Sequence, residues 1–160
     1  LQPTPLYTGP ETSRCFPFTG RLGHVGSRGR EHLTHTSTRT GAPMKLTEIA
    51  RVLDATLLVG EDKLDIDITR CGASDLMSDV LTGLSEGSLL LTGLTTVQVI
   101  RTASIAGVGA IVFVRGKTAP PEVLELARAG GMPLISAPHS MFVSCGRLHA
   151  QGLRGLNGHR

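Results

Sequence analysis

The sequence predicts an α/β fold, a single three-layer domain in which helices flank a mainly parallel sheet. Short apolar stretches of strand length alternate with segments of helical period along the second half of the chain, and this alternation is typical of the crossover units that build a parallel sheet. Two of the strand stretches, Leu89–Leu91 and Ala110–Val114, are apolar throughout, as central parallel strands are when both faces are buried.

The first half of the pattern begins at Met44. Apolar residues at helical spacing predict a helix, which is followed by two strands separated by a polar segment and then by a second helix started by Ser74 or Asp75. In chain order these elements span residues 46–53, 55–59, 66–71 and 75–84.

Three units of strand, short loop and helix complete the pattern, and local helix signals support them. Pro120 and Pro121 suit the first turn of a helix, Gly130 suits a helix C-terminus, and the residues from Thr95 to Gln98 form a capping-box pattern. In chain order the strands and helices span residues 88–92 and 95–106, 110–114 and 120–129, and 134–136 and 140–151.

Residues 1–43 lack such a pattern and are expected to form a disordered N-terminal tail. Of these 43 residues, 22 are Gly, Pro, Ser or Thr, so the segment has too little apolar surface to offset the entropy lost on ordering. Met44 is the expected natural start; the alternative is that the Arg-rich tail is a transit peptide, although its Pro and Gly content opposes an amphipathic helix. The predicted domain spans residues 44–153, and residues 154–160 are expected to form a flexible C-terminus.

Charge and aromatic content argue against nucleic acid as a partner. The formal charge of +3 comes from the tail, which contains five Arg and two Glu, whereas the rest of the chain balances eleven basic against eleven acidic residues. Phe113 and Phe142 are the only aromatic side chains after the tail, so neither a basic footprint nor a stacking platform is expected. Three Cys without a CxxC pair indicate a reduced, cytoplasmic setting, and no apolar run is long enough to span a membrane.

The region from Met44 to Leu153 resembles the DRTGG domain family, in its small single-domain subgroup. The resemblance rests on five blocks in this order: MKLTEIARVL, ASDLMSDVL, SLLLTGLTTVQVIRTA, AIVFVRGK and GMPLISAPHSMFVSCG. It implies a regulatory or dimerising module with no enzymatic activity and no cofactor, of the kind found beside CBS domains in nucleotide-regulated pyrophosphatases and similar to the non-catalytic N-terminal domain of HPr kinases. Single-domain members tend to be encoded near iron-only hydrogenase and redox-complex genes, which implies a redox-complex protein as a partner.

The chain departs from the residues that give this family its name. Leu94 and Thr95 stand where an Asp-Arg pair is expected after Thr92-Gly93. The residues from Val114 to Gly116 stand where Thr-Gly-Gly is expected. Any role of those groups in ligand binding by larger members therefore does not carry over directly.

A candidate ligand site lies at the carboxyl ends of three predicted parallel strands, where helix N-termini point free N–H groups. The loops at this edge supply backbone N–H groups, hydroxyls and two cations, which suit a phosphate or a carboxylate. The candidate ligand-binding residues are Thr92, Gly93, Thr95, Thr96, Arg115, Gly116, Lys117 and Ser140. The alternative is that Gly93 and Gly116 only make tight turns, while Thr95 and Thr118 cap helices.

Two other patterns have simpler explanations than the chemistry they suggest. Gly116-Lys117-Thr118 is not a P-loop, because Ile111 stands where the first glycine is required. Asp75 and Asp79 are four residues apart and are expected to share a helix face. There they offset the helix dipole more readily than they hold Mg²⁺ or transfer protons.

Cys145 and His149 are also four residues apart, with His139 upstream. These residues provide too few ligands for a zinc site, and nothing in the sequence orients the histidine for nucleophilic catalysis. No metal-ligating or catalytic residue is therefore assigned.

The sequence thus predicts a non-catalytic regulatory and dimerisation module that senses a small anionic metabolite or nucleotide. Two alternatives stay open: an accessory protein of a hydrogenase or redox complex that acts through protein contact alone, and a cryptic enzyme that uses the acidic pair or the Cys–His pair. For a homodimer, Met77, Met141 and Phe142 are expected to leave adaptable apolar surface exposed. Burial of these side chains in the core is the competing explanation.

Overall fold

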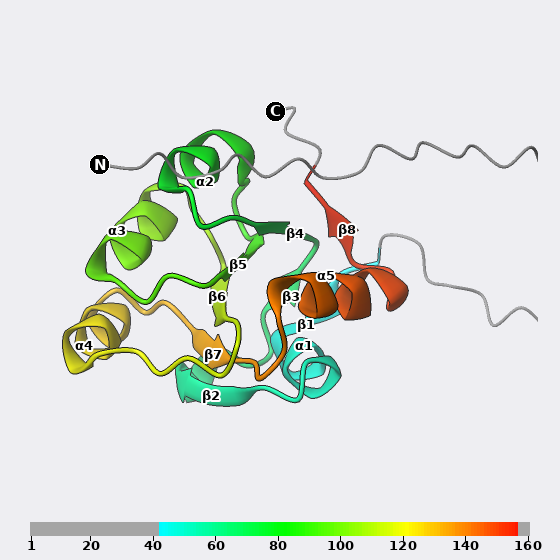
Figure 1. Ribbon diagram of the computed structural model, residues 1–160, viewed down its shortest axis with the longest axis horizontal. Coiled ribbons are helices and arrows are strands. Elements are labelled where there is room, and N and C mark those ends of the chain that lie inside the picture. Colours follow the sequence, from blue (N-terminus) through cyan, green and yellow to red (C-terminus); the bar gives the residue numbers. More distant parts are fainter. Residues whose placement is uncertain (1–41, 157–160) are drawn as a thin grey trace, which may run out of the picture. The chain divides into compact units, whose positions relative to one another are not determined.

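A six-stranded sheet with the strand order β2-β7-β6-β5-β4-β8 forms the centre of the domain (Figure 1). The structure is a computed structural model and describes residues 42–156. The strands of this sheet are β2 (Thr56–Val59), β4 (Arg70–Ala73), β5 (Leu89–Thr92), β6 (Ala110–Phe113), β7 (Leu134–Ser136) and β8 (Arg154–Gly155). Neighbouring strands are parallel except β2, which pairs antiparallel with β7. The predicted α/β fold with a mainly parallel sheet is confirmed.

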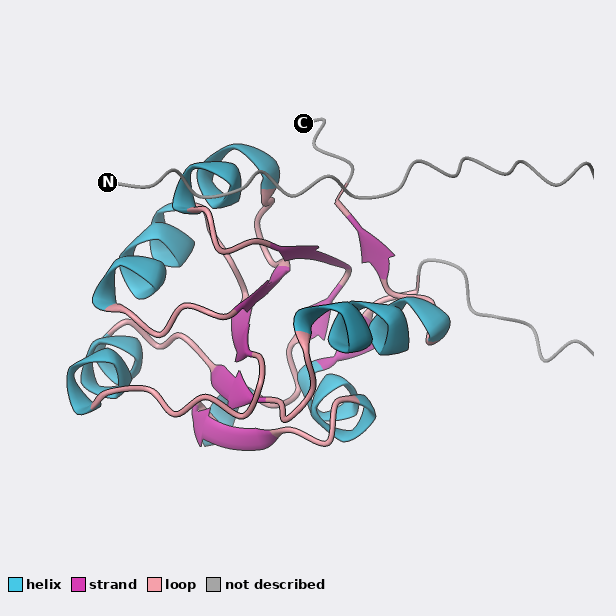
Figure 2. Cartoon of the chain, in the orientation of Figure 1, coloured by secondary structure: helices cyan, strands magenta, loops and turns pink. Residues whose placement is uncertain are grey.

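Helices cover both faces of this sheet, as expected for three layers (Figure 2). The helices are α1 (Leu46–Val52), α2 (Met77–Gly83), α3 (Val97–Ile105), α4 (Pro121–Ala129) and α5 (Met141–Ala150), with a short 3-10 helix η1 (Glu61–Lys63). Helices α1 and α5 pack on one face through Leu46 and Leu148. Helices α2, α3 and α4 pack on the other face through Val80, Ile100 and Val123.

The central strands β5 and β6 are buried along their whole length because helices cover them on both sides. Successive side chains of a strand point to opposite faces, so Leu89 and Leu91 face α1 and α5 while Leu90 faces the other three helices. Phe113 in β6 is 0% exposed and is the largest fully buried side chain among the described residues. The uniformly apolar sequence of these strands follows from burial on both sides.

The bounds of two elements predicted in the N-terminal half of the domain are wrong. The single strand expected over residues 66–71 is divided between β3 (Asp67–Ile68) and β4, and β3 pairs antiparallel with β1 (Met44–Lys45) in a separate two-stranded sheet. The helix expected from Ser74 or Asp75 begins only at Met77. The preceding residues form a loop instead, in which the Leu76 N–H donates to the Ser74 hydroxyl at 3.0 Å.

The C-terminal boundary expected at Leu153 is also corrected. Arg154–Gly155, assigned to a flexible end, form β8 and pair with Arg70 and Cys71 of β4. This strand is too short to show an alternation of side chains, and backbone hydrogen bonds hold it in place. The sequence pattern therefore did not predict it. The expected N-terminal tail, except residues 42 and 43, and residues 157–160 lie outside the described part of the chain. Within residues 42–156, no helix is long and apolar enough to cross a membrane.

Candidate functional site

The loops that follow β5, β6 and β7 meet at the carboxyl edge of the sheet. The Lys117 ammonium donates a hydrogen bond to the Gly93 carbonyl, which joins the first two loops. The Ser136 hydroxyl donates to the Lys117 carbonyl at 2.9 Å, and the Arg115 N–H donates to the His139 carbonyl at 2.7 Å. Gly93, Arg115 and Lys117 are therefore held in one cluster of loops.

Arg115 and Gly116 form the turn after β6 in the left-handed backbone region, with φ angles of 67° and 61°. Glycine adopts this conformation without strain, but an arginine does so at a cost. The Gly116 N–H donates to the Ala137 carbonyl at 2.8 Å and fixes the turn. The Arg115 side chain is left half-exposed at the edge of the sheet, and a strained non-glycine residue in such a loop is often part of a functional site.

Asp75 also lies in this cluster, although the sequence analysis did not place it there. Its Oδ1 accepts a hydrogen bond from the Gly93 N–H at 2.6 Å and another from the Thr92 hydroxyl at 3.0 Å. Its Oδ2 lies 3.7 Å from Arg115 Nη2. The carboxylate thus occupies the point where a backbone N–H, a hydroxyl and a guanidinium converge, which is an arrangement that favours an anion.

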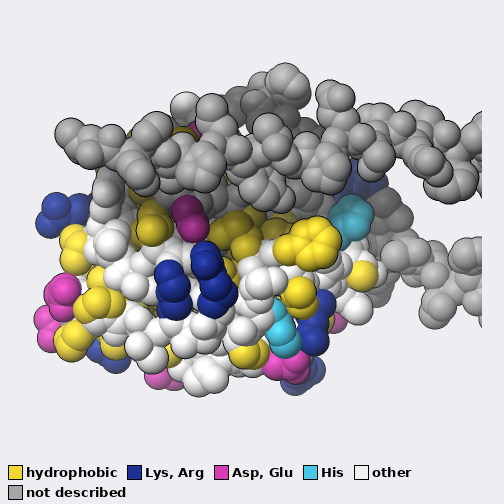
Figure 3. Space-filling model, in the orientation of Figure 1, with side chains coloured by type: hydrophobic (Ala, Val, Ile, Leu, Met, Phe, Trp, Pro, Cys, Tyr) yellow, Lys and Arg dark blue, Asp and Glu magenta, His cyan; other side chains and the backbone are white. Residues whose placement is uncertain are grey.

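Gly93 is needed for close approach at this point and not for a left-handed turn. A Cβ atom on this residue would lie 2.6 Å from Arg115 Nη2 and 3.2 Å from Asp75 Oδ2. A larger residue would therefore push the ion pair away. On the face shown in Figure 3, Lys and Arg side chains gather beside an acidic side chain, with hydrophobic side chains around them.

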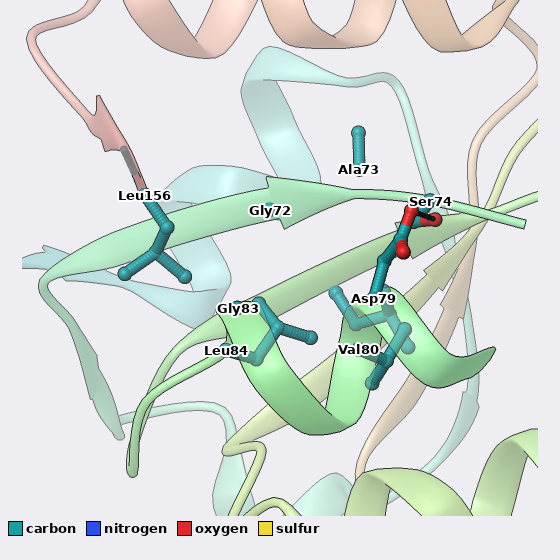
Figure 4. Close-up of a pocket in the computed structure, with 9 residues that line it drawn as sticks. Gly72, Ala73, Ser74, Asp79, Val80, Gly83, Leu84 and Leu156 are labelled. Atoms are coloured by element: carbon teal, nitrogen blue, oxygen red, sulfur yellow. Dashed lines mark hydrogen bonds between the residues drawn. The ribbon is translucent and has the colours of Figure 1, made fainter. Parts of the chain in front are cut away.

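Asp75 and Asp79 do not share a helix face, contrary to the sequence prediction. Asp75 precedes α2, whereas Asp79 lies in its first turn and its Oδ2 is 3.5 Å from the Ser74 hydroxyl (Figure 4). Ser74 and Asp79 line a cavity of about 160 Å³ whose other walls are largely apolar. Asp75 was considered only as a partner of Asp79 on a helix face, because the sequence pattern assigned this residue to the helix. The informative signal was its position just beyond the carboxyl end of a parallel strand.

The remaining candidate hydroxyls lie where helices leave the same edge. Ser140 caps α5, since its side chain accepts from the Val143 N–H at 3.4 Å. Thr96 is the N-cap residue of α3 but makes no side-chain capping bond, so the expected capping box with Thr95 does not form. Thr118 is not a cap either, because the residue before α4 is a proline. The alternative interpretation of these threonines as caps is therefore wrong.

Burial keeps the thiols of Cys71 and Cys145 protonated. It raises the pKa of Cys71 to about 11, with a further contribution from Cys145, and it also raises the pKa of Cys145. A thiol with a raised pKa is a poor nucleophile. His139 Nε2 lies 3.1 Å from Asp54 Oδ2, so His139 has a partner other than Cys145. Among residues 42–156, no group of three or more His, Cys, Asp or Glu side chains is placed to hold a metal ion.

Asp54 links the end of α1 to α5. Its Oδ2 accepts from Arg147 Nη1 at 2.6 Å, and the same Nη1 donates to the Val52 carbonyl at 3.1 Å. The hydrogen bonds from Arg147 and, to a smaller extent, from His139 hold the pKa of Asp54 below its ordinary value. This contact fastens one helix to the other.

An apolar groove lies where β4, β8 and α5 meet. It encloses about 430 Å³, and its lining includes Phe142, Cys145 and Leu156. Phe142 is 87% exposed, as expected for a surface contact. Met77 is only 8% exposed and belongs to the core, so its expected place on a contact surface is wrong. Met141 is half-buried against the α1 and α5 side of the core.

Comparison with known proteins identifies the family. The DRTGG domain family matches residues 48–150, and the chain belongs to this family. A search of curated proteins gives no match. Among solved structures, the CBS and DRTGG domains of the regulatory region of Clostridium perfringens pyrophosphatase, complexed with the activator diadenosine tetraphosphate, share the fold with a TM-score of 0.57 at 22% identity. The match covers 68% of this chain and 47% of that chain, so this chain spans about half the length of its structural relative.

An acidic and a basic side chain meet beside the loop that follows β5. The resemblance led us to expect an Asp-Arg pair in the loop after β5, where Leu94 and Thr95 stand. An Asp and an Arg nevertheless meet beside that loop, because Asp75 Oδ2 lies 3.7 Å from Arg115 Nη2. This chain therefore brings an acidic and a basic side chain together from two other loops.

Proposed function

We propose that this chain is a non-catalytic regulatory module that binds a small anionic metabolite or nucleotide at the loops after β5, β6 and β7. The observation that carries the proposal is the position of Asp75. The Gly93 N–H and the Thr92 hydroxyl already hold a carboxylate there, next to Arg115. A site that accommodates an internal anion has the donors and the charge to bind an external one.

The other candidate residues fit this role. The Lys117 ammonium uses one N–H on the Gly93 carbonyl, and two more donors are left for a ligand. Arg115 offers the fork of donors that recognises phosphate or carboxylate. The hydroxyls of Thr95, Thr96 and Ser140 line the start of two helices at the same edge, and Gly116 shapes the turn. A nucleotide agrees with the family and with the ligand of the pyrophosphatase regulatory region.

The test is a thermal-shift titration of the full chain with ADP, ATP and diadenosine tetraphosphate. A ligand that binds only the native state must raise the midpoint of unfolding. We expect at least one of these nucleotides to raise it, and Arg115→Gln or Lys117→Gln to reduce the shift. Arg128→Gln, an exposed change of the same charge in the last turn of α4, is the matched control and should keep the full shift. No shift with any ligand, or a full shift in Arg115→Gln, would contradict the proposal.

The module is also proposed to form a homodimer through the groove that contains Phe142. A phenylalanine buries roughly 150–250 Å² when it is covered, so leaving Phe142 exposed in the monomer forgoes a large apolar contribution. Pairing of one surface with its own copy is the commonest symmetric assembly. Cys71 and Cys145 are free thiols, as expected for a protein that functions in a reduced compartment such as the cytoplasm.

The same surface supports a second candidate function. An accessory subunit of a hydrogenase or other redox complex would use Phe142 to contact a different protein, with no ligand and no self-association. The exposed ring is compatible with either partner. Sedimentation of the isolated chain distinguishes them, because only the homodimer forms without another protein.

A further inference from the structure

We propose that Asp75 is a built-in competitor of the ligand, so that binding replaces its carboxylate at Gly93, Thr92 and Arg115. This inference rests on the proposed anion site and specifies how that site is regulated. The Gly93 N–H lies 2.6 Å from Asp75 Oδ1, and one N–H cannot serve a second anion at the same distance. An external anion that uses this donor must first displace the aspartate.

The contacts of Asp75 allow such an exchange. Its pair with Arg115 is long, at 3.7 Å, and the two side chains are 45% and 55% exposed. Exposed pairs of this kind contribute little to stability. The carboxylate is therefore held mainly by two hydrogen bonds, from the Gly93 N–H and the Thr92 hydroxyl. A group with more negative charge and more oxygen atoms can take over both bonds and also pair with Arg115.

The orientation of Thr92 defines the class of ligand. Its Oγ1 accepts a hydrogen bond from the Leu94 N–H at 3.2 Å, so its own proton is directed at Asp75. The three groups that contact the carboxylate, the Gly93 N–H, the Thr92 hydroxyl and the Arg115 guanidinium, are thus two donors and a cation. The position accepts a group with at least two anionic oxygens, and the nearby Lys117 ammonium favours a second charged group. These features fit a diphosphate better than a single carboxylate.

Displacement of Asp75 would move the loop that contains it and so affect the helix that follows. Asp75 belongs to the loop from Ser74 to Leu76 that connects β4 with α2, and the Ser74 hydroxyl lies 3.5 Å from Asp79 in the first turn of that helix. The cavity of about 160 Å³ beside Ser74 gives this loop space to move (Figure 4). Leu76, which is 60% exposed, moves with the loop. Ligand binding is thereby converted into a change of the surface at the start of α2.

Calorimetric titration of the full chain with pyrophosphate tests the inference, with succinate titrated in parallel to distinguish a phosphate from a carboxylate ligand. Asp75→Asn keeps an oxygen that can accept from the Gly93 N–H but removes the competing charge. We expect Asp75→Asn to bind pyrophosphate on the order of tenfold more tightly than the unmodified chain, because the binding-competent state is no longer a minor one. Asp79→Asn removes the same charge nearby, but its contact is with Ser74, and its affinity should stay within about twofold.

The outcomes separate this inference from the function on which it rests. Equal or weaker binding by Asp75→Asn overturns the competition and leaves the anion site intact. No binding of pyrophosphate by either protein overturns this inference, whereas the thermal-shift titration with nucleotides decides the proposed function. If Asp75→Asn does not fold, the amide resonance of Gly93 in the unmodified chain decides the question during titration with pyrophosphate. A large shift supports replacement of Asp75, and an unchanged resonance at saturation overturns it.

Discussion

Phe113 and Phe142 are the two aromatic side chains among residues 42–156, and their environments are opposite. Phe113 lies in β6 and is 0% exposed between the sheet and its helices, whereas Phe142 lies in the first turn of α5 and is 87% exposed. Folding accounts for Phe113, because its burial contributes to stability. Folding of residues 42–156 leaves Phe142 exposed beside an apolar groove, and the proposed homodimer would cover this side chain.

The largest expected effect is on stability at Phe113. Phe113→Ala should lower the free energy of unfolding by roughly 3–5 kcal/mol, the range for a core aromatic that leaves a cavity. Phe142→Ala should change it by less than about 0.5 kcal/mol in the monomer. Urea denaturation of both variants measures the difference. Similar losses of unfolding free energy in the two variants would contradict the assignment of Phe113 to the core and Phe142 to a contact surface.

The next effect is on assembly at Phe142. Sedimentation of the chain at micromolar concentration is expected to show a dimer, and Phe142→Lys is expected to be monomeric because a charge in an apolar contact is costly. Ile105→Lys is the matched control, since Ile105 is 79% exposed at the end of α3 and should leave the dimer intact. A monomeric unmodified chain would reject homodimerisation and favour a different protein as the partner of Phe142.

A second comparison, between a glycine in the candidate site and a glycine in a helix, tests the site itself. A Cβ atom at Gly93 would meet Arg115 and Asp75, whereas one at Gly146 in α5 meets nothing within 4 Å. Gly146→Ala should raise the free energy of unfolding by roughly 0.5–1 kcal/mol through helix propensity. Gly93→Ala should alter stability little, because flexible side chains can shift, but it should abolish the nucleotide-induced thermal shift. A normal shift in Gly93→Ala would show that the ligand does not use this loop.

The smallest expected effect is the contribution of Asp54 to the pH dependence of stability. Hydrogen bonds from Arg147 and His139 lower the pKa of Asp54 from its ordinary value of 3.8, so the ionised group stabilises the folded chain above that value. The stabilisation is lost as the pH falls through the folded pKa. Asp54→Asn should therefore be less stable than the unmodified chain near neutral pH, and the difference should shrink in acid. A difference that persists under acid conditions would assign it to packing and not to charge.

The sequence predicted the parts of the fold in which periodicity and burial coincide. The apolar runs of β5 and β6 identified the sheet, and the run of residues 110–114, which contains Phe113, was expected to be buried on both faces. The pattern could not distinguish Met77 from Phe142, because each is an apolar residue at the start of a short helix. It also could not identify β8, which is held by backbone bonds with Arg70 and Cys71.

The candidate site shows the same division. The rule that ligands bind at the carboxyl ends of parallel strands selected the loops of Gly93, Arg115 and Lys117, and the structure brings these residues together. Asp75 was not assigned to this site because the sequence does not show where α2 begins. Its side chain reaches the site only because residues 74–76 form a loop. Local hydrogen bonds decide the residue at which a helix begins, and the periodic spacing of apolar residues does not reveal those bonds.

A crystal structure of the chain grown with diadenosine tetraphosphate would show whether a ligand phosphate displaces the Asp75 carboxylate. The measurement is the position of the ligand phosphates relative to the Gly93 N–H and the Arg115 guanidinium. We predict a phosphate oxygen within hydrogen-bond distance of both groups, with the Asp75 carboxylate moved away from the Gly93 N–H. A ligand bound at another surface, while Asp75 keeps its present contacts at 2.6 and 3.0 Å, would contradict the account.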